Sequence, residues 1–232
     1  MKTCISTWSF CKLLDEGVLD HFGVIGKIRE MGVNAVELVL NDIPPDGGDP
    51  RDFALRLTEH ARSLGMEVPI YTTGANFCTP DVEKDTRRLE TEPWVEPPDP
   101  VLEAVAALVT ADRPAWGGTA TELAAAIREV AEYARSKGVT TCSENHGSLV
   151  QDSDRMLRIF TAVNHPNYRY LCDIGNFGGV DEDCAVAVSK LLPFISHVHA
   201  KDAFVRSGMW PAPARGWLPT RVGNYRSEEH TS

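Results

Sequence analysis

Apolar residues recur at helical spacing in three segments of the chain, and each segment runs into a glycine and then a short apolar stretch. Spacings of three and four residues place such side chains on one face of a helix. The glycines are Gly32, Gly65 and Gly138, and each has an arginine three residues before it. Cations favour the negative end of a helix dipole, and glycine accepts the left-handed conformation that ends a helix. The pattern therefore predicts three helix–glycine–strand units. The apolar helix positions are Phe22, Ile25 and Ile28, then Phe53, Leu57, Ala61 and Leu64, then Leu123, Ile127, Val130 and Ala134.

The runs after these glycines are short and partly β-branched, as expected of strands buried on both faces of a parallel sheet. Their starts repeat at roughly 30 residues, the spacing that eight βα units in about 250 residues require. The predicted fold class is an α/β barrel of the TIM (β/α)8 type. An open doubly wound sheet is the alternative, but no G-x-G-x-x-G motif follows a strand. Strands are predicted at 3–7, 33–40, 66–71, 139–143, 168–172 and 194–198, with a doubtful one at 101–109, and helices also at 153–163 and 182–192.

The composition argues against some classes of function and is consistent with the predicted fold class. A chain of 232 residues fits one barrel domain, and its net charge of −10 argues against binding to nucleic acid, because the surface would repel phosphates. The sequence lacks an apolar run of about 18 residues and a recognisable signal peptide, so we expect a cytoplasmic protein with no membrane contact. Six cysteines without a C-x-x-C pair indicate reduced, buried thiols.

Three predicted strands end in residues that commonly bind metals. Glu144 stands in TTCSENHG, Asp173 in YLCDIGNF and His199 in SHVHAKD. Side chains at the carboxyl ends of barrel strands point into the catalytic mouth, so the three should converge there. Two carboxylates and one imidazole would leave open positions on a divalent ion for a carbonyl and an adjacent hydroxyl.

The ordered motifs E-N-H-G, D-x-G-N-F and H-V-H-A-K-D resemble signatures of the sugar-phosphate isomerase/epimerase (xylose isomerase-like) family over residues 1–202, least clearly at 92–118. The resemblance implies that Glu144, Asp173 and His199 bind Mn²⁺, Mg²⁺, Co²⁺ or Zn²⁺, with Glu144 also acting as the first base. It implies isomerisation or epimerisation of a small sugar, sugar phosphate or keto-polyol through an enediolate. Family members complete the site with a glutamate at the end of strand eight, which we do not find in this sequence.

The alignment of these motifs with the family also suggests residues that line a sugar pocket. Each of these residues could instead have a purely structural role. Tryptophan more often packs in a core, and a histidine beside a ligand can serve a loop hydrogen bond. Asn176 stands where some family members have a histidine that contacts substrate. We expect His197 to face away from His199 and to pack against a helix. The candidate substrate-binding residues are Trp8, Glu37, His146, Asn176 and Lys201.

Other functions stay open at this point. The family also includes dehydratases of the inosose and dehydroshikimate type, and a non-catalytic barrel fragment is a further alternative. The family also includes apurinic endonucleases, which need a three-metal site with many histidines and carboxylates and a basic surface that faces DNA. Seven histidines and a net charge of −10 argue against that function. The expected partner is a small sugar or polyol, and a homo-oligomer is compatible with the sequence.

The C-terminal part departs from the barrel pattern. We expect a barrel domain at 1–206, an irregular tail at 207–225, and a non-native end at 226–232, where RSEEHTS resembles a translated sequencing adapter. Because one βα unit takes about 30 residues, the eighth strand should be missing and the barrel edges unpaired. We therefore expect this exact polypeptide to be an impaired fragment.

Overall fold

The computed structural model describes residues 2–40, 48–73, 120–146, 150–208, 218–219 and 223–227. The chain divides into two compact units, Met1–Pro114 and Ala115–Ser232. Each unit contains its own parallel sheet with helices packed against it, as an α/β barrel requires of its parts. The predicted domain boundary at residue 206 stays a prediction.

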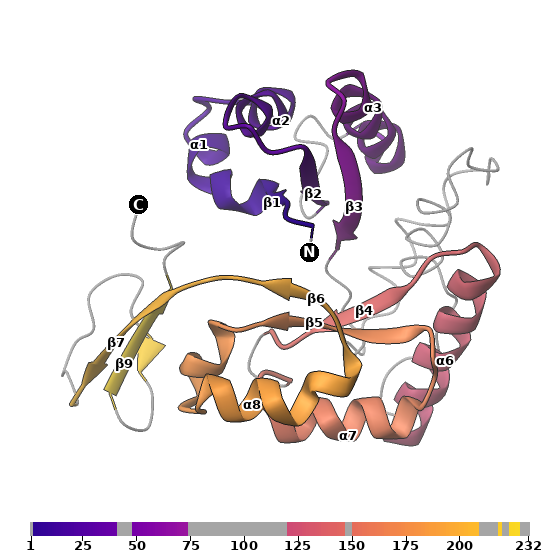
Figure 1. Ribbon diagram of the computed structural model, residues 1–232, viewed down its shortest axis with the longest axis vertical. Helices are drawn as coiled ribbons and strands as arrows, with labels where there is room; N and C mark the ends of the chain where they lie inside the picture. Colours follow the sequence, from indigo (N-terminus) through magenta and orange to yellow (C-terminus); the bar gives the residue numbers. More distant parts are fainter. Residues whose placement is uncertain are drawn as a thin grey trace. The chain divides into compact units, whose positions relative to one another are not determined.

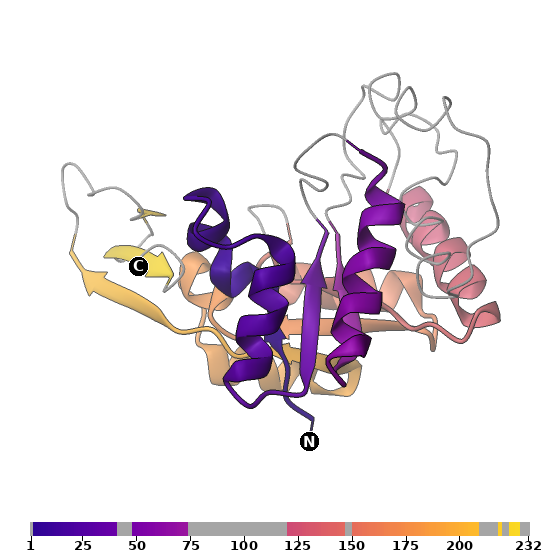
Figure 2. The same ribbon diagram turned by 90° about the horizontal axis from the view of Figure 1, so that it is seen from above.

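The first unit is built on a parallel sheet of order β1-β2-β3. Helices α2 and α3 lie side by side against this sheet (Figures 1 and 2). Asp20 and Asp49 cap their N-termini, and their carboxylates accept hydrogen bonds from the Gly23 and Arg51 amides, both at 2.7 Å. The elements are β1 (Ile5–Ser6), η1 (Thr7–Phe10), α1 (Cys11–Asp15), α2 (His21–Glu30), β2 (Ala35–Val39), α3 (Pro50–Ser63) and β3 (Glu67–Thr72).

The second unit carries another parallel sheet, of order β4-β5-β6. Helices α6, α7 and α8 follow one another along one side of it (Figure 1), with α6 contacting β4 and α7 contacting β5. The carboxyl ends of all three strands lie at the same edge, because parallel strands run in one direction. The elements are α6 (Ala120–Ser136), β4 (Thr141–Glu144), α7 (Ser153–Val163), β5 (Tyr168–Asp173), η2 (Asn176–Val180), α8 (Cys184–Leu191), η3 (Leu192–Phe194) and β6 (Ile195–His199).

The glycine-ended repeat of the sequence is confirmed. Gly32, Gly65 and Gly138 all have positive φ, at 84°, 71° and 72°, so each ends its helix in the left-handed conformation. The predicted apolar faces of α2 and α3 form the buried core of the first unit together with β2. Six of the seven predicted strands are present, and the doubtful one at 101–109 lies outside the described residues.

The expectation of an irregular tail after residue 206 was wrong in part. The strands β7 (Ala203–Ser207), β8 (Leu218–Pro219) and β9 (Gly223–Ser227) form an antiparallel sheet of order β7-β9-β8. Strand β9 also takes in the first two residues of the RSEEHTS segment. Antiparallel strands pair through backbone groups, so β7 and β9, neither of which contains proline, can form without clear alternation of side chains.

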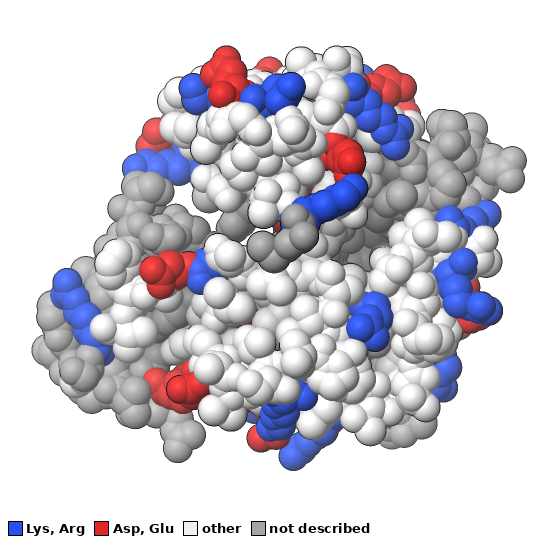
Figure 3. Space-filling model, viewed as in Figure 1, with Lys and Arg blue, Asp and Glu red and all other residues white. Residues whose placement is uncertain are grey.

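Two further expectations concern the surface and the thiols. None of the helices in the described ranges is long and apolar enough to cross a membrane. On the face in Figure 3, acidic and basic side chains are interspersed over the described residues. Of the five cysteines that the structure describes, only Cys172 is buried, so the expectation of buried thiols was wrong for the other four; Cys78 lies outside the described residues.

Tyr168 offers a test of the packing between the second sheet and its helices. Its hydroxyl donates to Ser143 Oγ at 2.7 Å, and burial raises its pKa to about 12. The unfolded chain therefore ionises this group first as pH rises above 10, and stability should fall by about 2–3 kcal/mol between pH 10 and 12. Urea unfolding of Tyr168→Phe across that interval should show a shallower loss than wild type. If Tyr168→Phe lost stability with pH as steeply as wild type, burial would not raise the pKa of Tyr168 in the folded protein.

Candidate metal centre

Three metal-ligand side chains meet at the carboxyl edge of the second sheet. Glu144, Asp173 and His199 are the last residues of β4, β5 and β6. His199 Nδ1 lies 3.5 Å from Glu144 Oε1 and 3.9 Å from Asp173 Oδ2. One ligand atom from each residue lies within 4.8 Å of the other two. The structure thus brings together the three residues that the sequence selected.

The donor set fits a divalent cation. Ligand atoms at about 2.0–2.3 Å from one ion lie at most about 4.6 Å apart, so the separations of 3.5 Å and 3.9 Å suit a shared ion. Two carboxylates and one imidazole are ligand types that Mn²⁺, Co²⁺ and Zn²⁺ accept. Glu144, Asp173 and His199 are therefore the residues that would hold a metal here.

Asp173 is held so that one of its oxygens faces the other ligands. Its Oδ1 accepts the backbone N–H groups of Gly175 at 2.9 Å and Asn176 at 3.0 Å. Its Oδ2 lies 3.1 Å from Lys201 Nζ. Burial raises the pKa of Asp173, and the Lys201 ammonium and the Asn176 N–H partly offset that rise. Only Oδ2 is thus directed at the candidate metal position.

Asn176 connects the ligands through its side-chain amide. Its Nδ2 donates to Glu144 Oε1 at 3.3 Å and to the Asn145 carbonyl at 3.0 Å, while its Oδ1 accepts from Lys201 Nζ at 2.7 Å. The side chain is buried, and both its polar atoms have protein partners. The geometry favours a role in orienting Glu144, and its predicted contact with substrate stays a prediction.

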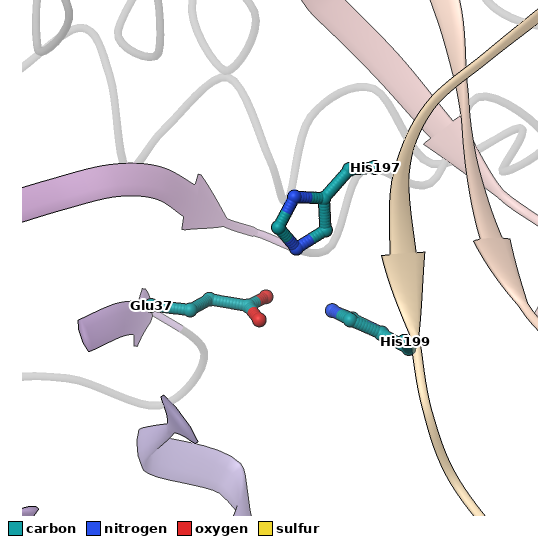
Figure 4. A group of neighbouring side chains, drawn as sticks. All are labelled: Glu37, His197 and His199. Atoms are coloured by element: carbon teal, nitrogen blue, oxygen red, sulfur yellow. The ribbon is translucent and has the colours of Figure 1, made fainter. Parts of the chain in front are cut away.

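The expected orientation of His197 was wrong. His197 and His199 project from the same side of β6 (Figure 4), with ring centroids 5.7 Å apart and planes at 86°. Residues two apart on a strand share a face, because successive side chains alternate. His197 therefore lies beside His199 and does not point toward the helices.

The other predicted substrate residues occupy mixed environments. His146 is exposed, and its backbone N–H donates to the Glu144 carbonyl at 3.0 Å. In the first unit, Trp8 lies in η1 with 48% of its surface exposed. Glu37 is the central residue of β2, and it is buried and accepts a hydrogen bond from Thr72 Oγ1 at 2.5 Å. Contact of these residues with substrate stays a prediction.

Sequence reasoning missed Asn145, although it stands directly after Glu144 in the E-N-H-G motif. Its side chain is fully buried and hydrogen-bonds to both backbone groups of Asp173. A polar amide next to a strand-end ligand was the available signal. Gln151 was also missed, and its Nε2 donates to the Asn176 carbonyl at 2.5 Å.

Gly175 permits the close approach of the chain after β6 to the turn after β5. A Cβ at this position would lie 2.8 Å from the Lys201 carbonyl oxygen, a backbone atom. Gly175→Ala should therefore force the two segments apart and lower the free energy of unfolding by about 1–3 kcal/mol. Urea unfolding measures this cost. Gly26→Ala, at a helical position with open space around it, is the matched control and should not destabilise the protein.

Several solved structures are similar in fold to this chain. The probable 3-DHS dehydratase AsbF of Bacillus anthracis, described as involved in petrobactin synthesis, superposes with a TM-score of 0.59 at 17% identity, over 87% of this chain and 73% of that one. A D-psicose 3-epimerase of Clostridium cellulolyticum H10 gives 0.53 at 15% identity, over 78% and 67%. A xylose isomerase domain protein of Planctomyces limnophilus gives 0.55 at 15% identity, over 98% and 77%.

The search of curated proteins finds no match to this sequence. The family model described as xylose isomerase-like TIM barrel, in contrast, matches residues 25–212, which is most of the chain. That span includes all three candidate metal ligands and both parallel sheets except β1. The chain therefore belongs to the xylose isomerase-like TIM-barrel family.

Proposed function

We propose that this protein binds one divalent metal ion through Glu144, Asp173 and His199 and isomerises or epimerises a small sugar, sugar phosphate or keto-polyol. The observation that carries the proposal is the convergence of these three side chains at the carboxyl ends of adjacent parallel strands. The same edge is where barrel enzymes build their active sites. The similarity in fold to a D-psicose 3-epimerase supports a sugar substrate.

Each residue has a distinct task in this reaction. A bound divalent ion supplies Lewis-acid polarisation of the substrate carbonyl. Glu144 takes the proton from the carbon next to that carbonyl, and the Asn176 amide orients its carboxylate. The Lys201 side chain adds a positive charge beside Asp173, which suits an anionic or hydroxyl-rich substrate.

Isomerisation and epimerisation differ in the number of proton-transfer groups that they require. An aldose–ketose isomerisation can use Glu144 alone, because the proton removed from one carbon can return to its neighbour on the same face. Epimerisation needs a second acid on the opposite face of the substrate. Isomerisation therefore requires only Glu144, and epimerisation requires a further proton-transfer group.

A dehydratase is the second candidate. The TM-score of 0.59 to the probable 3-DHS dehydratase is higher than those to the epimerase and the isomerase-domain protein. Dehydration begins with the same removal of a proton next to a carbonyl, so Glu144 would act in the same way. The two functions then differ in whether a hydroxyl group leaves, which product analysis resolves.

The test uses the purified 232-residue chain after treatment with a chelator. It is incubated in D₂O with Mn²⁺ or Co²⁺ and a panel of ketoses, aldoses and keto-polyols, and NMR follows deuterium entry next to the carbonyl. We expect exchange that requires added metal, and its rate tests the expectation that this polypeptide is impaired. Conversion to an isomer supports the first candidate, and appearance of an enone or deoxy product supports the second.

The two histidines of β6 provide a matched pair for the metal site. His199→Gln should lose Mn²⁺ binding, because His199 supplies the imidazole nitrogen of the set, 3.5 Å from Glu144 Oε1 and 3.9 Å from Asp173 Oδ2. His197→Gln, two residues earlier on the same strand, should keep it. Titration with Mn²⁺ monitored by electron paramagnetic resonance measures both. Equal binding by wild type and His199→Gln would refute the proposed ligand set.

A further inference from the structure

We infer that Asn145 is a positioning residue that fixes Asp173 relative to Glu144 and so sets the spacing of the two carboxylate ligands. The inference rests on the proposed metal-binding function. It concerns a residue outside the ligand set, whose side chain hydrogen-bonds to the backbone of the candidate ligand Asp173.

The role follows from where strand pairing stops. Strand β4 ends at Glu144, which pairs with Leu171 of β5, so Asp173 lies two residues beyond the last β4–β5 pair. On its other side, Asp173 pairs with His199. On the β4 side, Asn145 Oδ1 accepts the Asp173 N–H at 2.8 Å, and Asn145 Nδ2 donates to the Asp173 carbonyl at 2.9 Å. One side-chain amide thus makes both hydrogen bonds that a neighbouring strand would make.

Burial makes this contact costly to rearrange. Asn145 is 0% exposed, and Asp173 is 2% exposed. Rotating the amide away would leave a buried N–H and a buried carbonyl without partners, and each such group costs about 1–3 kcal/mol. The backbone of Asp173 is therefore tied to the residue that directly follows Glu144.

The carboxylate of Asp173 is constrained in turn. Its Oδ1 is committed to the N–H groups of Gly175 and Asn176, so the carboxylate cannot turn freely about its own axis. Asn145 fixes the main chain, and this turn fixes the side chain. Together they hold Oδ2 at 3.9 Å from His199 Nδ1. Partners that orient metal ligands in this way typically change metal affinity by about 10–100-fold when they are removed.

Strand β5, which ends in Asp173, has a matched control residue directly before its first residue. Asn167, directly before β5, also donates two hydrogen bonds through Nδ2, to the carbonyls of Ala131 at 2.9 Å and Val139 at 2.7 Å. Asn167→Ala removes a comparable amide clamp far along the strand from the ligands. It should lower stability without changing metal binding.

The experiment compares Asn145→Ala, Asn145→Ser and Asn167→Ala in the full chain. Electron paramagnetic resonance titration gives the Kd for Mn²⁺, and ¹⁵N NMR hydrogen exchange gives the protection of the Asp173 amide. We expect both Asn145 variants to raise the Kd by about 10–100-fold and to speed exchange at Asp173. Asn167→Ala should leave both quantities at the wild-type level.

The outcomes separate this inference from the proposed function. Wild-type Mn²⁺ affinity in the Asn145 variants would overturn the positioning role while leaving the metal site in place. Failure of the wild-type chain to bind Mn²⁺, with faster Asp173 exchange only in the Asn145 variants, would support the clamp and overturn the proposed function. Unfolding of both Asn145 variants while Asn167→Ala folds would overturn the positioning role. Asn145 would then be needed for the stability of the whole second unit and not for the placement of Asp173 alone.

Discussion

Replacing Glu144 with glutamine is expected to slow metal-dependent proton exchange next to the substrate carbonyl by at least about 10²-fold. Glutamine keeps the size of the side chain and can still meet the Asn176 amide through its carbonyl oxygen. It cannot accept the substrate proton, because an amide is not a base near neutral pH. The fold should survive, since no described core cluster includes Glu144. Deuterium entry measured by NMR at saturating Mn²⁺ gives the rate.

Metal affinity distinguishes the two tasks assigned to Glu144. A residue that is both ligand and base should lose rate at saturating metal and also show weaker Mn²⁺ binding. A large loss of rate with unchanged affinity would restrict Glu144 to proton transfer. Glu129→Gln, at an exposed position of α6, is the control for loss of one negative charge and should leave rate and affinity unchanged. Exchange by Glu144→Gln at more than a tenth of the wild-type rate would refute its role as the base.

The local repeat made much of the fold predictable. A helix with one apolar face, a glycine with positive φ and a short β-branched strand form within one continuous segment, so the sequence around Gly32 or Gly65 contains all the information needed. The proximity of the candidate ligands Glu144, Asp173 and His199 was predictable for a related reason. The ends of parallel strands necessarily share an edge, and placing each residue at a strand end places the three together.

The features that were missed depend on pairing between distant segments. Strand β9 forms by antiparallel pairing with β7, about 20 residues away, and its own residues show little alternation. Asn145 appeared as an ordinary loop residue because its two partners belong to Asp173, 28 residues later. The error at His197 was of another kind, because strand periodicity alone places it on the same face as His199.

Four aromatic rings from α7, β5 and η3 pack together on the second sheet. Phe160 of α7 stacks on Phe194 with centroids 5.1 Å apart, and it lies 4.9 Å from the ring of Tyr168 and 5.5 Å from that of Tyr170. Phe160 is 2% exposed. The strand carrying both tyrosines also ends in Asp173, so the packing around Phe160 supports the element that presents a candidate metal ligand.

Phe160→Ala should lower the free energy of unfolding by about 3–5 kcal/mol, because it removes buried apolar surface and leaves a cavity among three rings that cannot close around it. Urea unfolding followed by circular dichroism measures the loss. Phe204→Ala is the matched control within the same unit, since Phe204 is 51% exposed and its truncation should cost far less. Equal destabilisation by the two variants would contradict the assignment of Phe160 to the core. Mn²⁺ binding by Phe160→Ala at low urea tests the link to the site, and weakened binding is expected because β5 loses part of its support.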